Sequence, residues 1–183
     1  MTGSLTNQQK EKLLKLSRDT ISLYLKSKKV LSQEITDPAL KEQMGAFVTL
    51  RKNDQLRGCI GNIIARKPFY LEVIDMSIAS STQDPRFAPV RQEELKDITI
   101  EISAISPLKK ISSCDEIVLG VHGVLIRSGF RSGVYLPQVA TETGWNKEEF
   151  MSSLCVQKAG IEADAWKTGK CDIYIFSAQV FSE

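Results

Sequence analysis

Residues 46–62, AFVTLRKNDQLRGCIGN, decide the fold class of this 183-residue chain. Residues 46–51 and 55–62 are rich in the residue types that favour β-strands. Residues 52–54, Lys-Asn-Asp, lie between them and favour a tight turn. The segment therefore predicts a β-hairpin.

Further strands and helices are expected on both sides of this hairpin. Ile98, Ile100 and Ile102 alternate with polar residues, which predicts a strand with one face on a core. Other strands are expected over residues 121–126, over residues 133–136 and in a final strand with Ile173, Ile175 and Val180. Helices are expected over residues 6–29, 69–81 and 146–158, the first and last opened by the capping-box pairs Thr6/Gln9 and Asn146/Glu149. Because the strands occur in hairpins rather than alternating singly with helices, we expect an α+β fold with a largely antiparallel sheet and flanking helices.

Length and composition exclude several classes of protein. The chain has the length of one compact domain, and 24 basic against 22 acidic side chains give a net charge of only +2. So weak a field does not by itself indicate nucleic acid or a membrane surface as a partner. No segment has the length and apolarity of a membrane span, and residues 1–10 lack the apolar core of a signal peptide, so a cytoplasmic location is expected.

The residue inventory also limits the chemistry. Four cysteines without a CxxC pair indicate reduced thiols rather than a disulfide framework or a zinc site. The single histidine, His122, excludes an HExxH metalloprotease. The glycine-rich nucleotide-binding motifs and the GxSxG elbow are absent, so we expect no metal and no cofactor.

The segment 56–61, Leu-Arg-Gly-Cys-Ile-Gly, is the most unusual part of the sequence. In a strand, the period of two places alternate side chains on opposite faces, with Leu56, Gly58 and Ile60 toward the core and Arg57, Cys59 and Gly61 away from it. A guanidinium beside Cys59 favours the thiolate. Two glycines around the cysteine indicate that a backbone or a ligand approaches closely. The alternative is a buried cysteine in a tightly packed hairpin, with Arg57 bound to a carboxylate.

Three other places supply candidate site residues. His122 lies in Gly-Val-His-Gly, residues 120–123, and is a ready acid or base near neutral pH, although a lone histidine is more often structural. If it lay near Cys59, the two would form a catalytic pair. Asp84 and Arg86 share one loop, where Arg86 binds an anion or the two form a local clasp. Gln138 follows Pro137 at the start of an expected helix, where backbone donors can receive an anion.

Taken together, these motifs resemble the AMMECR-one domain family, also called AmmeMemoRadiSam system protein A. The resemblance covers nearly the whole chain, over residues 5–181, and rests on segments 56–61, 84–87, 120–123, 135–139 and 144–145. The segment 56–61 is close to diagnostic, whereas the others are persuasive only as a set. Asn62 stands where small hydroxyl residues are more usual.

The resemblance implies a single domain of two intimately packed lobes, with a cleft toward which the segment 56–61 faces. It implies no settled activity, but it links the chain to Memo-type and radical-SAM proteins in a modification pathway. Our leading hypothesis is a cleft that binds a small anionic or peptide-like ligand, with thiol chemistry at Cys59 and acid–base help from His122. The ligand contacts would come from Arg57, Gly58, Gly61, Asp84, Arg86 and Gln138. The alternative is a non-enzymatic adaptor that binds a protein or nucleic acid at the same surface.

Overall fold

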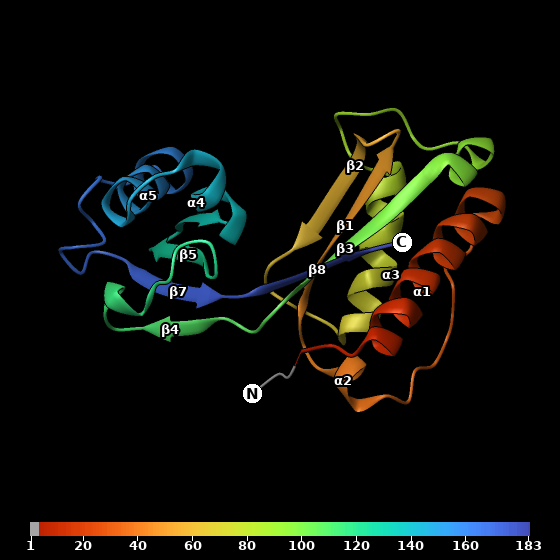
Figure 1. Ribbon diagram of the computed structural model, residues 1–183, viewed down its shortest axis with the longest axis horizontal. Coiled ribbons are helices and arrows are strands. Elements are labelled where there is room, and N and C mark those ends of the chain that lie inside the picture. Colours follow the sequence, from red (N-terminus) through yellow and green to blue (C-terminus); the bar gives the residue numbers. More distant parts are fainter. Residues whose placement is uncertain (1–3) are drawn as a thin grey trace. The chain divides into compact units, whose positions relative to one another are not determined.

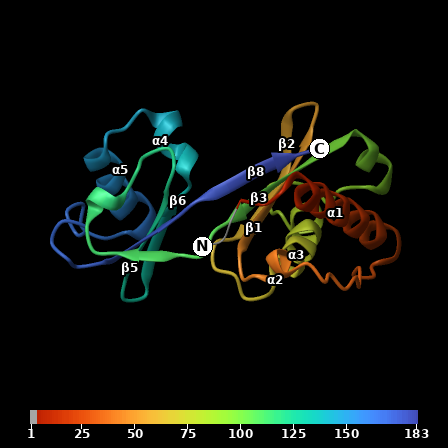
Figure 2. The same cartoon turned by 60° about the horizontal axis from the view of Figure 1, so that its bottom comes forward.

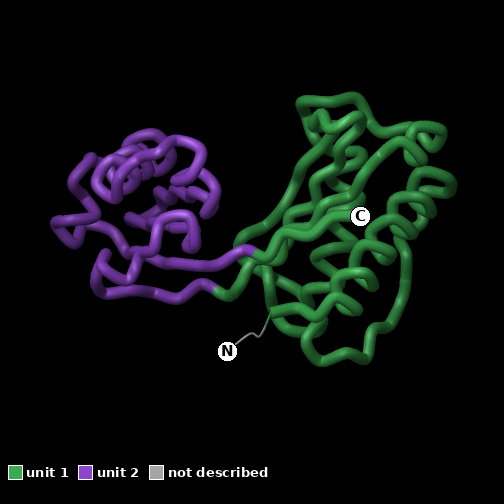
Figure 3. The backbone as a smooth tube through the Cα atoms, viewed as in Figure 1, with its two compact units in different colours: residues 1–107, 179–183 green, residues 108–178 purple. Residues whose placement is uncertain are grey.

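The computed structural model describes residues 4–183, and they form two compact units (Figure 3). Unit 1 comprises residues up to Pro107 together with Gln179–Glu183, and unit 2 comprises Leu108–Ala178. Unit 2 is therefore an insertion between two strands of unit 1. Each unit holds one four-stranded sheet, which confirms the α+β class with antiparallel pairing and flanking helices.

Unit 1 is a sheet covered on one face by two long helices (Figures 1 and 2). The strand order is β2-β1-β3-β8, so β2 is an edge strand. The strands are β1 (Gly45–Lys52), β2 (Gln55–Asn62), β3 (Ile98–Ile105) and β8 (Ala178–Ser182). The helices are α1 (Asn7–Ser27), the short α2 (Pro38–Lys41), α3 (Phe69–Thr82) and a 3-10 turn, η1 (Gln92–Asp97).

The predicted elements of unit 1 are present because local signals and burial agree. The capping box of Thr6 and Gln9 opens α1, and Lys28 ends it in the left-handed region. Asn53 and Asp54 both have positive φ, as a tight hairpin turn between β1 and β2 requires. The alternation in β3 is confirmed, because Ile98, Ile100 and Ile102 are all buried.

The period of two fails at one end of β2. Leu50 of β1 opposes Gly58, but Arg51 opposes Leu56, so Arg57 is an extra residue in a β-bulge. The expectation that Leu56 faces the core is wrong, since it is 38% exposed. Gly58 is buried on the side of α3, as expected.

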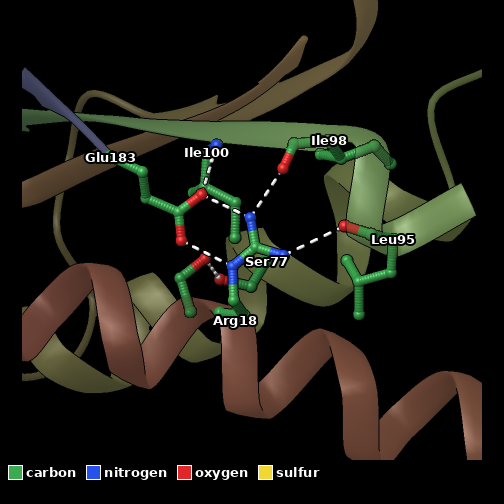
Figure 4. A network of polar contacts seen from close by, with 7 residues as sticks. Arg18, Ser77, Leu95, Ile98, Ile100 and Glu183 are labelled. Carbon is green, nitrogen blue, oxygen red and sulfur yellow. Dashed lines mark hydrogen bonds and ion pairs between the residues drawn. The ribbon is translucent and has the colours of Figure 1, made fainter. Parts of the chain in front are cut away.

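The C-terminus is tied into unit 1 through Arg18 of α1 (Figure 4). Its guanidinium binds the Glu183 carboxylate and donates to the carbonyls of Leu95 (3.0 Å) and Ile98 (2.6 Å). The carboxylate in turn accepts from the Ile100 N–H at 3.0 Å. This network joins α1 to the end of the β3–β8 pair at which β3 begins and β8 ends.

Unit 2 has the strand order β4-β7-β5-β6. Its strands are β4 (Lys109–Ile111), β5 (Gly123–Ser128), β6 (Arg131–Tyr135) and β7 (Asp172–Phe176). A 3-10 turn, η2 (Cys114–Glu116), and the helices α4 (Pro137–Thr143) and α5 (Lys147–Ser153) complete it, and α5 continues as a π turn, η3 (Leu154–Ala159). A second apolar core lies between this sheet and these helices.

Two sequence predictions in this region are corrected. The strand expected over 121–126 begins at Gly123, because His122 lies in a turn closed onto Val118. The single final strand is two strands in different sheets: Ile173 and Ile175 belong to β7, and Val180 to β8. The capping box of Asn146 and the stop at Gly160 are confirmed, although the last turns are π-helical.

Candidate functional site

Cys59 lies in the edge strand β2, and the loop after α3 satisfies its outward backbone groups. Its N–H donates to Asp84 Oδ2 at 2.8 Å, and its carbonyl accepts from Arg86 Nη2 at 3.1 Å. Asp84 also accepts from Arg86 Nε (2.9 Å), Nη2 (2.7 Å) and the backbone N–H (3.1 Å). The pair takes the place of a neighbouring strand at this point and protects the edge. We call it the Asp84–Arg86 clasp.

The clasp joins a buried carboxylate to an exposed guanidinium. The hydrogen bonds from Arg86 outweigh burial and hold the pKa of the Asp84 carboxyl well below its usual range, and the Cys59 N–H adds to this effect. The Arg86 side chain is 53% exposed and rests over the Phe87 ring, 5.5 Å from its centroid. The contacts with Asp84 and the Phe87 ring therefore fix the orientation of the guanidinium, while part of it stays exposed to solvent.

The Cys59 thiol has two polar neighbours. Thr49 Oγ1, on the opposing strand β1, donates to Cys59 Sγ at 3.3 Å. The Arg86 pKa is raised, first by its hydrogen bond to Asp84 and further by interaction with the Cys59 side chain, so the guanidinium lies beside the thiol. A hydroxyl donor and a guanidinium therefore both lie near the Cys59 side chain.

Gly58 and Gly61 are explained by close approaches within unit 1. A Cβ on Gly58 would lie 2.2 Å from the Ser80 carbonyl oxygen of α3, and one on Gly61 would lie 2.2 Å from the Phe47 ring. The sequence left open whether a backbone or a ligand approaches these glycines. At Gly58 it is a backbone, and at Gly61 it is an aromatic side chain, while a ligand contact at either stays a prediction.

Arg57 binds a carboxylate, as the alternative interpretation of its motif anticipated. Its guanidinium donates to Glu94 at 2.8 and 3.4 Å, and Lys52 reaches the same carboxylate at 3.3 Å. The pKa of Glu94 is lowered to about 2, and the hydrogen bond from Arg57 is the largest cause. Burial acts in the opposite direction, and the Arg91 N–H lowers the pKa further. Lys52, Arg91, Glu93 and Glu94 line an open cavity of about 290 Å³ beside this ion pair. The charge beside Cys59 thus comes from Arg86, and Arg57 fastens the hairpin to η1.

His122 and Gln138 belong to unit 2. His122 Nδ1 accepts from the Val118 N–H at 3.1 Å, and the His122 N–H donates to the Val118 carbonyl at 2.9 Å. The histidine therefore closes its own turn, in which Gly120 has a φ of +79°. Gln138 is exposed on α4. Because Cys59 lies in unit 1 and His122 in unit 2, their catalytic pairing stays a prediction.

Thr49, Glu94 and the position of Arg86 beside the thiol were not predicted from the sequence. A regular register from the two-residue turn would oppose Thr49 to Gly58, and only the bulge at Arg57 moves Cys59 opposite Thr49. The one sequence signal for this arrangement was the presence of Asp84 and Arg86 in a single loop, which suggested a local clasp between them.

Within residues 4–183, no group of three or more metal-ligating side chains lies together. Nor is any helix in this part of the chain long and apolar enough to cross a bilayer.

Fold and site together define an α+β protein of two sheets that holds a cysteine in a clasped edge strand. The chain matches the AMMECR1 family model over residues 14–181 and belongs to that family. Protein MK0488 from Methanopyrus kandleri is 41% identical over 192 residues, covering 100% of this chain and 92% of that protein. The crystal structure of the uncharacterized protein PH0010 from Pyrococcus horikoshii is similar, with a TM-score of 0.84 at 36% identity, covering 98% of this chain and 93% of that one.

Proposed function

We propose that the Cys59 surface of unit 1 binds a small ligand through an anionic group and presents the thiol to it. Arg86 would hold the anion, Cys59 would contact or attack the ligand, and Asp84 would position Arg86. This assigns to Arg86 the charge-holding role that the sequence suggested for Arg57.

The observation that carries this proposal is the exposure of a firmly oriented guanidinium. Arg86 Nε and Nη2 donate to Asp84 and to the Cys59 carbonyl, and the Arg86 side chain is nevertheless 53% exposed. Such an oriented and exposed donor beside a thiol suits a carboxylate or phosphate oxygen. The fixed geometry also lowers the entropy that Arg86 loses on binding.

The ligand would be peptide-like or small, and it would belong to a modification pathway with Memo-type and radical-SAM partners. That link is supported by family membership alone. His122 would supply the acid or base if the units bring it to Cys59. The chain's weak net charge gives no support to nucleic acid as the ligand.

The competing function is a non-enzymatic adaptor that recognises a partner by shape and charge. Arg57, Gly58 and Gly61 all contact other groups of unit 1, so few side chains of the segment 56–61 remain for a chemical reaction, and this favours the adaptor. The two functions differ in their response to substitution. Cys59→Ser should abolish a catalytic function, whereas an adaptor should tolerate it and fail with Arg86→Ala.

The test compares two alkylating reagents at Cys59, negatively charged iodoacetate and neutral iodoacetamide. Arg86 should favour iodoacetate, so Arg86→Gln should lower the iodoacetate to iodoacetamide rate ratio by about fivefold, the factor for one charge pair near 4 Å in water. Arg57→Gln is the matched control and should leave the ratio unchanged. An equal ratio in the wild type and Arg86→Gln would refute the anion site.

A further inference from the structure

A carboxylate lies two strands away from Cys59, in the same row of side chains across the sheet of unit 1. Thr49 of β1 is opposite Cys59 of β2 on one side and opposite Glu101 of β3 on the other. Directly opposed residues point their side chains to the same face of a sheet. The contact of 3.3 Å between Thr49 Oγ1 and Cys59 Sγ agrees with this. Cys59, Thr49 and Glu101 therefore share one face.

The face with this row is opposite to the one that α1 and α3 cover (Figures 1 and 2). Successive side chains of a strand alternate between the two faces. The residues next to the row in the sequence are accordingly fully buried in the core of unit 1: Val48, Leu50, Ile100 and Ile102. Cys59 is half-buried, and the Glu101 side chain is 26% exposed, so both are accessible to a small molecule.

Opposite charges lie at the two ends of the row. Arg86 is at the outer side of β2, where it donates to the Cys59 carbonyl at 3.1 Å. Glu101 is at the other end, and two strand spacings place its Cα about 10 Å from that of Cys59. The ion pair of Glu101 is loose, because the nearest nitrogen of Arg51 is 4.0 Å away and the Arg51 side chain is 42% exposed. Exposed pairs of this kind are weak, so the carboxylate remains available to a second cation.

We propose that Glu101 binds a cationic group of the ligand, so that the Cys59 surface selects a dipolar molecule. This inference rests on the function proposed above, in which Arg86 holds an anionic group. The two charged groups of the ligand are then about 10 Å apart, which is the length of about three residues of extended peptide. A short peptide with its carboxylate at Arg86 and an ammonium group at Glu101 has this separation of charge.

The test compares two thiol reagents at Cys59 in the folded, full-length protein at low ionic strength. One is the cationic 2-(trimethylammonium)ethyl methanethiosulfonate, and the other is the neutral methyl methanethiosulfonate. Glu101→Gln should lower the ratio of the cationic to the neutral rate by about twofold, the factor for one charge pair near 10 Å in water. Arg51→Gln removes the cation beside Glu101 and should raise the ratio. About 1 M salt should abolish both effects, because screening then acts within ~3 Å.

Glu11→Gln is the matched control. Glu11 is an exposed residue of α1, on the covered side of the sheet, and its replacement changes the net charge by the same amount. It should leave the rate ratio unchanged. No loss in Glu101→Gln, or an equal loss in Glu11→Gln, would overturn the proposal.

The same measurements separate this inference from the proposed function. If Arg86→Gln lowers the iodoacetate to iodoacetamide ratio while Glu101→Gln leaves the cationic to neutral ratio unchanged, the anion site stands and the cation site is refuted. If Cys59 reacts with neither methanethiosulfonate in the folded protein, no ligand reaches the row, and both proposals fall.

Discussion

Cys59 and Cys155 are both held firmly, but by opposite means. Polar groups surround Cys59: Thr49 donates to its thiol, and the Asp84–Arg86 clasp binds its backbone. Cys155 is fully buried in an apolar cluster, and burial is the leading cause that raises its pKa. The comparison teaches that the neighbours of a thiol, rather than its residue type, decide whether it can react.

Gly58→Ala should damage the Cys59 surface most, because the added Cβ would lie 2.2 Å from the Ser80 carbonyl, a backbone atom that cannot turn away. We expect a loss of about 3 kcal/mol in the free energy of unfolding, measured by urea denaturation. Gly129→Ala is the control: it meets no atom within 4 Å, and its φ of +59° should cost only about 1–2 kcal/mol. Equal losses would show that Gly58 is not tightly packed.

The next effect should come from acid, which acts on the ion pairs that support the Cys59 strand. Arg57 lowers the pKa of Glu94 to about 2, below its unfolded value, so the stabilisation is complete above about pH 4.5 and is lost as pH falls toward 2. Asp84, with its pKa lowered by Arg86, has the same sign. We expect unfolding free energy to fall by about 3 kcal/mol between pH 6 and pH 2.5, with a shallower fall in Glu94→Gln. The same slope in Glu94→Gln and the wild type would contradict this assignment.

Asp84→Ala should cost about 2 kcal/mol, because it removes the acceptor of the Cys59 N–H and the partner of Arg86. The control is Asp172→Ala, which breaks an ion pair with Lys110 whose two side chains are both more than half exposed. That change should cost less than about 0.5 kcal/mol. Urea denaturation of the two variants side by side checks the difference, and similar losses would mean that the clasp is only a surface ion pair.

Much of the fold could be predicted because its signals are local. The capping boxes at Thr6 and Asn146, the turn at Asn53 and Asp54 and the alternation in β3 all depend on residues close together in the sequence. The division into two sheets could not be predicted, since β7 and β8 are adjacent in sequence and pair in different units.

The residues of the candidate site could be named from the sequence, but their arrangement could not. Cys59, Asp84 and Arg86 were all named, yet the bulge at Arg57 reassigned the charge beside the thiol. A bulge adds one residue without a distinctive sequence pattern, so the period of two in a strand cannot reveal it.

The most direct test of the account is the alkylation rate of each cysteine in the folded protein as a function of pH, resolved by mass spectrometry. Cys59 should react fastest at neutral pH, while Cys155 and Cys171, whose pKa values are raised by burial, should react slowly. A Cys59 that stays unreactive until the chain unfolds would contradict the account and leave its motif with a packing role alone.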